Sequence, residues 1–248
     1  MKLLFDIGNT RIKWAYDSGS ELLYAGEVTH WGSSVGDVSQ VIAALEHPAD
    51  EIWAVNVAGD ELAKVFTTAI TKRFGVSPYF VRTAHRYGEV VNGYEDVSQH
   101  GVDRWAAVVG AWYQYRSNVC VVDVGTAMTI DLVRADGQHE GGFILPGTRL
   151  MTTALHRDTS DIEAFSGRRE SFEQERWCGN DTLSAVQLGA VFALRAAVTE
   201  SARMLGKETR VVLTGGDADA LLPLSGIEYE TRPLLVLEGL QRLAAAEH

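Results

Sequence analysis

The sequence predicts an α/β protein built from two similar halves, and three observations support that prediction. An apolar run, Asp-x-Gly and a second apolar run occur twice, at 3–13 and at 121–131. The order of strand and helix patterns after the first copy is repeated after the second. The 46% apolar fraction of the 248 residues supports a proper core and argues against disorder. We therefore expect two stacked α/β domains, residues 1–116 and 117–248, with a cleft between them.

In the first half, short apolar runs predict strands, and apolar residues at helical spacing predict helices. The strands are expected at 2–7, 11–16, 22–28, 52–56 and 79–81, and the helices at 37–46, 61–74 and 102–115. A loop that bears Gly, Asn and Tyr precedes the last of these helices.

The second half repeats the same order. Its strands are expected at 118–124, 127–133, 139–145 and 210–213, and its helices at 147–157, 182–205 and 234–245. A short helix is expected after the glycine pair at 215–216. The charged stretch 158–176 is typical of a flexible surface loop.

The first Asp-x-Gly hairpin carries groups that suit a phosphorylated ligand. Asp6 is placed to organise hydrated Mg²⁺, and Gly8, Asn9 and Thr10 offer backbone and side-chain donors to phosphates. Lys13 on the returning strand is placed to neutralise a transferring phosphoryl group. Taken alone, the segment favours a plain hairpin whose turn happens to be Gly-Asn-Thr. The second copy shifts the balance toward a duplicated domain that grips a nucleotide between its halves.

The second hairpin offers Asp123 for a monovalent cation or for placing Mg²⁺, and Thr126 for phosphate. Asp131 lies further along the returning strand, on a face that the sequence leaves open, and we do not assign it to the site. The segment 211–218 reads as a strand, paired glycines and a helix start, which suits packing an adenosine ring or ribose against bare backbone. An ordinary turn between strand and helix is the alternative.

Asp103 and Arg104 open a strongly apolar helix. Asp103 in that place is either a helix-start residue that interacts with the helix dipole or a general base that accepts the proton of a substrate hydroxyl, while Arg104 grips an anion. Trp105, Trp112 and Tyr115 follow on the same helix, and we expect them to pack in the core or in a dimer rather than to stack on a ligand.

Composition narrows the classes of function. A net charge of −11 and a pI near 5.1 make nucleic acid an unexpected partner, whereas local dipoles and a divalent cation still allow a small anionic substrate. Neither G-x-x-x-x-G-K-[ST] nor G-x-G-x-x-G occurs, and the seven histidines show no metal-ligand spacing. No signal peptide is recognisable, no apolar run approaches a membrane span, and Cys120 and Cys178 read as reduced thiols. We expect a cytoplasmic protein with no membrane partner.

Four motifs in order resemble type III pantothenate kinase. They are Asp6-x-Gly8-Asn9-Thr10-x-x-Lys13, Gly101-x-Asp103-Arg104, Asp123-x-Gly125-Thr126-Ala127 and Gly141-Gly142-x-Ile144-x-Pro146-Gly147. The resemblance implies the duplicated ribonuclease-H-like (actin-like ATPase) fold of acetate and sugar kinases, Hsp70 and actin. It implies ATP-dependent phosphorylation of the 4′-hydroxyl of pantothenate, the first step of coenzyme A biosynthesis. It also implies a homodimer, a divalent ion such as Mg²⁺, and a monovalent cation, K⁺ or NH4⁺.

The resemblance also implies residue roles. Asp103 is the general base, Asp123 holds the monovalent cation, and Asp6 holds Mg²⁺ through water. The residues implied to bind ATP are Asp6, Ile7, Gly8, Asn9, Thr10, Arg11, Ile12, Lys13 and Thr126. The residues implied to bind pantothenate are Tyr94, Gly101, Val102, Asp103, Arg104 and Thr182, the last of them reached across the dimer.

Two segments depart from the family pattern. Asp181 precedes Thr182 where relatives more commonly have Asn, and the stretch 159–162 lacks the Thr-Ala-x-Leu-Pro pattern often found there. The rival interpretations are another small-molecule kinase or phosphatase on the same fold, and a non-catalytic accessory regulator. The retained Asp103, Lys13 and both hairpins favour an enzyme over the regulator.

Overall fold

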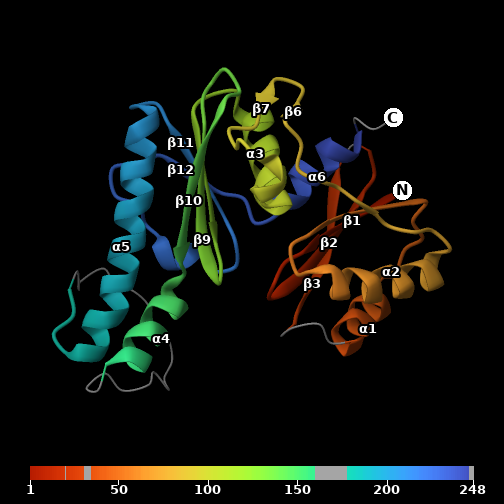
Figure 1. Cartoon of the computed structure of the whole chain (residues 1–248), viewed down its shortest axis with the longest axis horizontal. Coiled ribbons are helices and arrows are strands. Elements are labelled where there is room, and N and C mark those ends of the chain that lie inside the picture. Colours follow the sequence, from red (N-terminus) through yellow and green to blue (C-terminus); the bar gives the residue numbers. More distant parts are fainter. Residues whose placement is uncertain (20, 31–34, 160–177, 246–248) are drawn as a thin grey trace. The chain divides into compact units, whose positions relative to one another are not determined.

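A computed structural model describes residues 1–19, 21–30, 35–159 and 178–245 (Figure 1). The chain forms two compact units, one of Met1–Gln114 with Leu234–His248 and one of Tyr115–Pro233. The C-terminal helix therefore groups with the N-terminal half, a placement that a linear division of the sequence does not anticipate.

The first unit contains a five-stranded mixed sheet in the order β3-β2-β1-β4-β5. β1 and β2 pair antiparallel, as do β2 and β3, whereas β4 and β5 continue the sheet in parallel. The elements are β1 (Lys2–Ile7), β2 (Arg11–Asp17), β3 (Leu22–Thr29), α1 (Val35–Ala44), β4 (Glu51–Asn56), α2 (Asp60–Phe74), β5 (Tyr79–Phe80), β6 (Arg86–Tyr87), β7 (Val90–Val91), η1 (Val97–Gln99), α3 (Val102–Tyr115) and α6 (Leu235–Ala245).

The second unit repeats this sheet in the order β10-β9-β8-β11-β12, with the same antiparallel and parallel pairings. Its elements are β8 (Val119–Val124), β9 (Ala127–Val133), β10 (His139–Pro146), α4 (Thr148–Asp158), α5 (Thr182–Leu205), β11 (Arg210–Thr214), η2 (Ala218–Leu221) and β12 (Tyr229–Thr231). The predicted duplicated α/β fold is confirmed. The loop expected at 158–176 falls outside the described residues from position 160 on.

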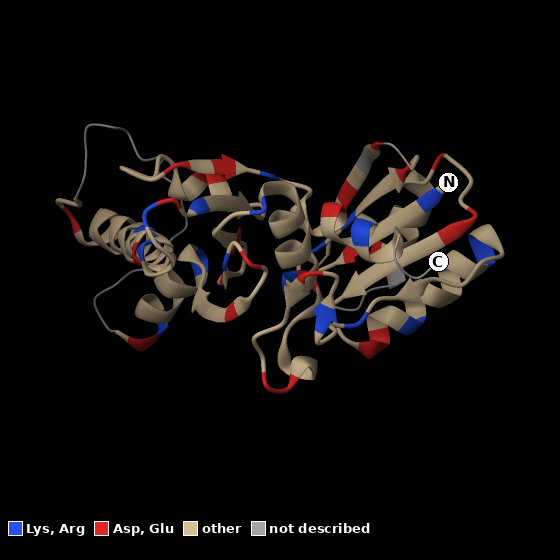
Figure 2. Ribbon diagram, turned by 90° about the horizontal axis from the view of Figure 1, so that it is seen from above, with Lys and Arg blue, Asp and Glu red and all other residues tan. Residues whose placement is uncertain are grey.

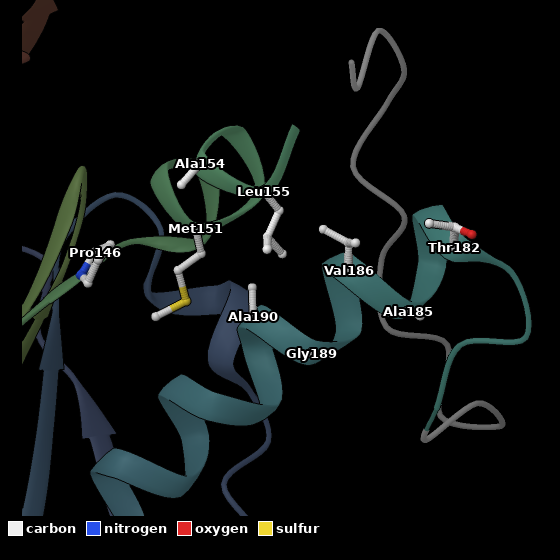
Figure 3. Close-up of a pocket in the computed structure, with 9 residues that line it drawn as sticks. All are labelled: Pro146, Met151, Ala154, Leu155, Thr182, Ala185, Val186, Gly189 and Ala190. Carbon is white, nitrogen blue, oxygen red and sulfur yellow. The ribbon is translucent and has the colours of Figure 1, made fainter. Parts of the chain in front are cut away.

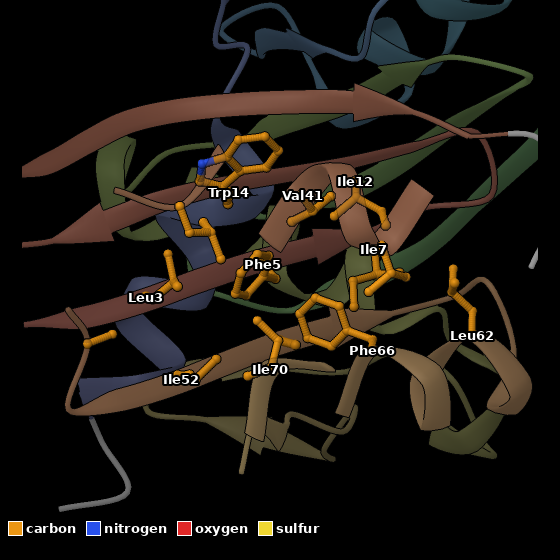
Figure 4. Close-up of a cluster of buried hydrophobic side chains, with 14 of the residues drawn as sticks. Leu3, Phe5, Ile7, Ile12, Trp14, Val41, Ile52, Leu62, Phe66 and Ile70 are labelled. Carbon is orange, nitrogen blue, oxygen red and sulfur yellow. The ribbon is translucent and has the colours of Figure 1, made fainter. Parts of the chain in front are cut away.

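The core of the first unit follows from strand alternation. Leu3, Phe5 and Ile7 point to one face of β1, where α1 and α2 cover them (Figure 4). Phe66 of α2 packs edge-on against Phe5, with ring centroids 4.7 Å apart. Each such buried side chain contributes about 1.5–3 kcal/mol. Ile7 thus anchors the first Asp-x-Gly turn in the core.

Helix α2 shows why these residues form a helix. Leu62, Phe66 and Ile70 recur every four residues and are buried. Asp60 lies in the first turn, and Gly75 ends the helix in the left-handed conformation, its N–H donating to Thr71 O at 2.8 Å.

The second unit has a matching core. Cys120, Val122 and Val124 alternate along β8 and meet Leu194 and Val198 of α5. The inner stripe of α5 thus packs on this sheet.

The opposite face of the first sheet is covered by α6. Gln241 donates to Asp17 Oδ1 at 2.8 Å, and Lys2 Nζ donates to Ala244 O at 3.0 Å. Gly239 lets α6 cross α3 closely, because a Cβ at that position would overlap the Ala106 carbonyl. These long-range contacts explain why α6 belongs to the first unit.

α5 corrects the expectation that no apolar run is long enough to span a membrane. By length and composition it meets that test, with a mean hydropathy of 1.4 over 18 residues, and it alone does so within the described part of the chain. Its buried stripe nevertheless packs on the second sheet. Arg195, near its middle, donates to the carbonyls of Leu221 and Leu222 at 2.9 and 2.6 Å. These bonds fix α5 within its globular unit.

Charged residues of both signs are interspersed along the ribbon of each unit (Figure 2). The net charge of −11 therefore does not set the sign of the field at any single loop. Local side chains and backbone dipoles decide it.

The two cysteines should differ in reactivity. Burial raises the pKa of the Cys120 thiol to about 12, with the nearby Asp131 charge adding to the effect, whereas Cys178 is exposed. At pH 8 only about one in 10⁴ Cys120 thiols would be ionised. We expect iodoacetamide to modify one thiol per native chain and two per chain in guanidinium, as counted by mass spectrometry. Rapid double modification of native protein would contradict this burial.

Candidate active site

The first hairpin places an aspartate and a lysine on neighbouring strands, directly opposite each other. Asp6 on β1 and Lys13 on β2 are directly opposed partners in the antiparallel ladder, so both side chains project from the same face. The neighbouring pair, Ile7 and Ile12, points to the other face and is fully buried. The core thus fixes which face of the hairpin tip carries the charges.

The turn between these strands is tight. The Gly8 N–H donates to Arg11 O at 3.0 Å, and Asn9 at the tip is exposed. The Arg11 side chain extends toward Glu27 of β3, with its Nη1 3.6 Å from Oε1. The hairpin presents backbone and short polar side chains at its tip, as the sequence predicted.

His30 is a contributor that sequence reasoning missed. It follows β3, is 1% exposed, and its Nε2 donates to Gly8 O at 2.7 Å. Its own N–H donates to Thr10 O at 2.8 Å. A histidine after a strand gives no local signal of this role, because its target is 22 residues away.

The second hairpin has the same construction in the second unit. Asp123 is the last residue but one of β8, where it pairs with Thr129 of β9 and Thr214 of β11. The Gly125 N–H donates to Ala127 O at 3.0 Å, and Thr126 is exposed at the tip. Gly147 closes over this turn by donating its N–H to Thr126 O at 3.0 Å.

The glycine pair after β11 lies directly on the second hairpin. Gly215 has φ +92°, and a Cβ there would overlap Asp123 Oδ1 and the Val124 carbonyl. The Asp217 N–H donates to Val124 O at 2.9 Å. The segment predicted to pack a ribose or an adenosine ring is thus joined to the Asp123 turn.

Asp131, left open by the sequence, lies on the same face of its sheet as Asp123. Its β9 neighbours Ile130 and Leu132 point into the core beneath α5. The Asp131 carboxylate instead meets His139 of β10 at 3.0 Å, and both side chains are buried.

A second polar cluster of the first unit lies at the start of α3. Arg104 is 7% exposed, and its Nη1 donates to the Tyr94 hydroxyl at 2.9 Å. The guanidinium carbon lies 5.7 Å from the centroid of the Tyr94 ring. The structure thus brings together two residues that the sequence predicted to bind one substrate.

Tyr94 is held in place by contacts with His100 and Asn92. Its ring stacks on His100 at 4.5 Å with an interplanar angle of 9°. Asn92 Oδ1 accepts from the Tyr94 N–H at 3.0 Å and lies 3.2 Å from His100 Nδ1. This support was not predicted, because stacking depends on how the loop folds back.

Asp103 lies in the first turn of α3, where its Oδ1 accepts from the Arg104 N–H at 2.7 Å. A Cβ at Gly101 would come within 2.7 Å of the same oxygen. Glycine at 101 therefore makes room for the carboxylate, which is half-buried beside Arg104.

Thr182, the remaining residue predicted to bind the substrate, belongs to the second unit. It begins α5, and Asp181 caps the helix by accepting from the Ser184 N–H at 2.9 Å. The extra negative charge at 181 thus lies at a helix N-terminus, where it is favourable. Thr182 lines an apolar groove of about 760 Å³ between α4 and α5 (Figure 3). The other lining residues are Pro146, Met151, Ala154, Leu155, Ala185, Val186, Gly189 and Ala190.

Residues 2–204 match the family model described as type III pantothenate kinase. A type III pantothenate kinase from Cupriavidus pinatubonensis is 35% identical over 272 residues, which cover 98% of each chain. One from Chromobacterium violaceum is 33% identical over 250 residues, 98% of this chain and 99% of its own.

Solved structures show the same fold at lower identity. A Campylobacter jejuni protein assigned to the Baf family of transcriptional activators superposes with a TM-score of 0.61 at 22% identity, covering 99% of this chain and 98% of its own. The activator of 2-hydroxyisocaproyl-CoA dehydratase from Clostridium difficile, solved with bound ADPNP, gives 0.56 at 10% identity, covering 99% and 94%.

Proposed function

The chain belongs to the type III pantothenate kinase family, and from that premise we propose that its two Asp-x-Gly hairpins hold one ATP while Asp103 activates pantothenate. The reaction is ATP-dependent phosphorylation of pantothenate in coenzyme A biosynthesis, catalysed by a phosphotransferase with an alcohol group as acceptor. The acceptor atom is the 4′-hydroxyl. The observation that carries the assignment of roles is the contact of Tyr94 and Arg104 next to Asp103.

The residues around Asp103 bind pantothenate and orient its hydroxyl. Arg104, a buried cation, pairs with the pantothenate carboxylate, and the Tyr94 hydroxyl holds the guanidinium in place. Gly101 and Val102 line the approach to α3. Asp103 accepts the proton of the attacking hydroxyl and orients it for in-line displacement.

The first hairpin binds the phosphates. Backbone N–H groups and side chains from Asp6 to Lys13 contact them, and Lys13 neutralises charge that develops on the transferred group. The carboxylate of Asp6 and the hydroxyl of Thr10 are hard oxygen donors that suit Mg²⁺ held through water. When bound, the ion supplies neutralisation of phosphate charge.

The second hairpin completes the nucleotide site. Thr126 at its exposed tip contacts phosphate, and the carboxylate of Asp123 is an oxygen ligand for K⁺ or NH4⁺. The glycine pair docked on this turn leaves bare backbone for the nucleoside. We place the enzyme in the cytoplasm, where a buried reduced Cys120 is stable.

We also propose a homodimer formed through the second unit, which brings Thr182 to the partner's substrate. Seven of the ten large apolar side chains that are exposed in the described residues lie on β10, α4 and α5. These are Phe143, Ile144, Leu150, Leu155, Leu183, Phe192 and Met204. Exposed apolar side chains gathered on adjacent elements are typical of a protein interface.

Phe192→Glu is expected to weaken this dimer at least tenfold, because Phe192 is 71% exposed on α5 and a buried charge would have no partner. Sedimentation equilibrium measures the dissociation constant. Leu23→Glu, at a 48% exposed position of β3 in the other unit, is the control and should leave it unchanged. Equal effects of the two substitutions, or none, would contradict the proposed interface.

A coupled ADP-release assay tests the reaction. We expect ADP to form only when MgATP and pantothenate are both present, and its rate to rise when K⁺ or NH4⁺ replaces Na⁺. A panel of other hydroxylated acceptors tests for a different small-molecule kinase. Nucleotide binding without turnover would instead favour the accessory regulator.

A further inference from the structure

We propose that His30 is a positioning residue for the nucleotide, which it serves by fixing the Gly8–Asn9 peptide of the first hairpin. The inference rests on the proposed phosphate-binding role of that hairpin. His30 has no place in the mechanism above and lies outside the motifs that identify the family.

The contact is specific in its chemistry. A carbonyl oxygen only accepts hydrogen bonds, so His30 Nε2 must carry the hydrogen and donate it to Gly8 O at 2.7 Å. The ring is 1% exposed, so water cannot readily replace it. The His30 N–H to Thr10 O bond, 2.8 Å, holds the same turn at a second carbonyl.

The peptide plane transmits this bond to the ligand side. In a trans peptide the carbonyl and the following N–H point in opposite directions. With Gly8 O directed at His30, the Asn9 N–H is directed away from it, at the exposed tip of the turn. Together with the Gly8 N–H to Arg11 O bond at 3.0 Å, this orients a donor for phosphate before the nucleotide arrives.

Two substitutions at position 30 both introduce a side-chain amide, but only one of the amides is long enough to reach Gly8 O. The amide nitrogen of Gln lies near the position of histidine Nε2. The amide nitrogen of Asn lies near the position of Nδ1, so the Asn side chain is too short to bond to Gly8 O. His30→Asn should therefore weaken MgAMPPNP binding about tenfold, and His30→Gln should stay within about threefold of wild type. Isothermal titration calorimetry measures both values on the full chain.

Steady-state kinetics supply the second readout. His30→Asn should raise the KM for ATP about tenfold while the KM for pantothenate at saturating ATP changes less than about twofold. Tyr16→Phe is the control, because it removes side-chain bonds to the backbone elsewhere in the unit: the Tyr16 hydroxyl donates to His47 O and accepts from the His47 N–H, both at 3.3 Å. It should change neither KM.

The outcomes distinguish this inference from the function on which it rests. If wild type fails to bind MgAMPPNP, the proposed function of the hairpin is wrong. If wild type binds and Asn and Gln behave alike, or both KM values rise together, His30 has no positioning role. Should His30→Asn not fold, hydrogen exchange of the Gly8–Arg11 amides is measured in folded His30→Gln. Protection of these amides equal to wild type supports the inference. Lost protection with unchanged nucleotide affinity overturns it.

Discussion

Replacing Asp103 with Asn is expected to lower kcat by about 10²–10⁴-fold, the usual range for loss of a general base. The substitution keeps the size of the side chain and an oxygen that can accept the Arg104 N–H, now 2.7 Å from Oδ1. It removes the carboxylate that takes up the proton. Affinity for MgAMPPNP should stay within about twofold, because the phosphates contact other residues. Single-turnover kinetics and calorimetry measure the two quantities.

Asp96→Asn is the matched control for this change. Asp96 lies on the same segment, and its carboxylate accepts from the Ser98 N–H at 3.0 Å to cap η1. Asn caps about as well as Asp, so kcat should hardly change. If Asp103→Asn retained wild-type turnover, Asp103 would not be the base. If both substitutions lowered turnover alike, the effect would come from the fold of this segment.

Gly215→Ala should destabilise the protein by about 2–5 kcal/mol, the sum of overpacking and a left-handed backbone that L-residues avoid. The backbone at Gly215 has φ +92°, and the added Cβ would overlap Asp123 Oδ1 and the Val124 carbonyl. The Asp123 turn must move to relieve the overlap, so we also expect MgATP binding to weaken at least tenfold. Urea denaturation followed by circular dichroism measures the loss of stability.

Gly226→Ala separates strain from overlap. Gly226 has φ +72° in the same unit, but a Cβ there would meet nothing within 4 Å. It should cost only about 1–2 kcal/mol and leave nucleotide binding unchanged. Equal losses for the two variants would show that backbone strain alone acts at 215 and that the glycine pair does not pack on the Asp123 turn.

Much of the fold follows from local pattern. The hairpins at 2–17 and 119–133 are confirmed because alternating apolar residues of this length fit little besides strands. Helix α5 was predicted with its bounds, since Leu194 and Val198 mark its buried stripe. The short strands β6, β7 and β12 were not predicted, because two or three residues carry no periodicity.

Other features of the fold depend on long-range packing, which the local sequence pattern does not predict. The docking of α6 on the first unit depends on Gly239 meeting α3, far away in the sequence. Trp105 and Trp112 were expected in the core or in a dimer, and both are buried.

The site was predicted in the same uneven way. The predicted hairpin brings Asp6 opposite Lys13, because a hairpin of this length fixes its own register. Family resemblance assigned Tyr94 and Arg104 to one substrate, but neither their hydrogen bond nor the stack of Tyr94 on His100 was predicted. The contact of His30 and the face on which Asp131 lies could be assigned only from the folded sheets, since a strand pattern alone does not tell which polar groups meet.

We propose that both hairpins act on one ATP. Calorimetric titration with MgAMPPNP tests it on three proteins: wild type, Asp6→Asn and Asp123→Asn. We predict one nucleotide per chain in wild type, and binding weakened at least about tenfold by either substitution. Two nucleotides per chain, or a substitution that leaves the affinity unchanged, would contradict a nucleotide site shared by the two hairpins.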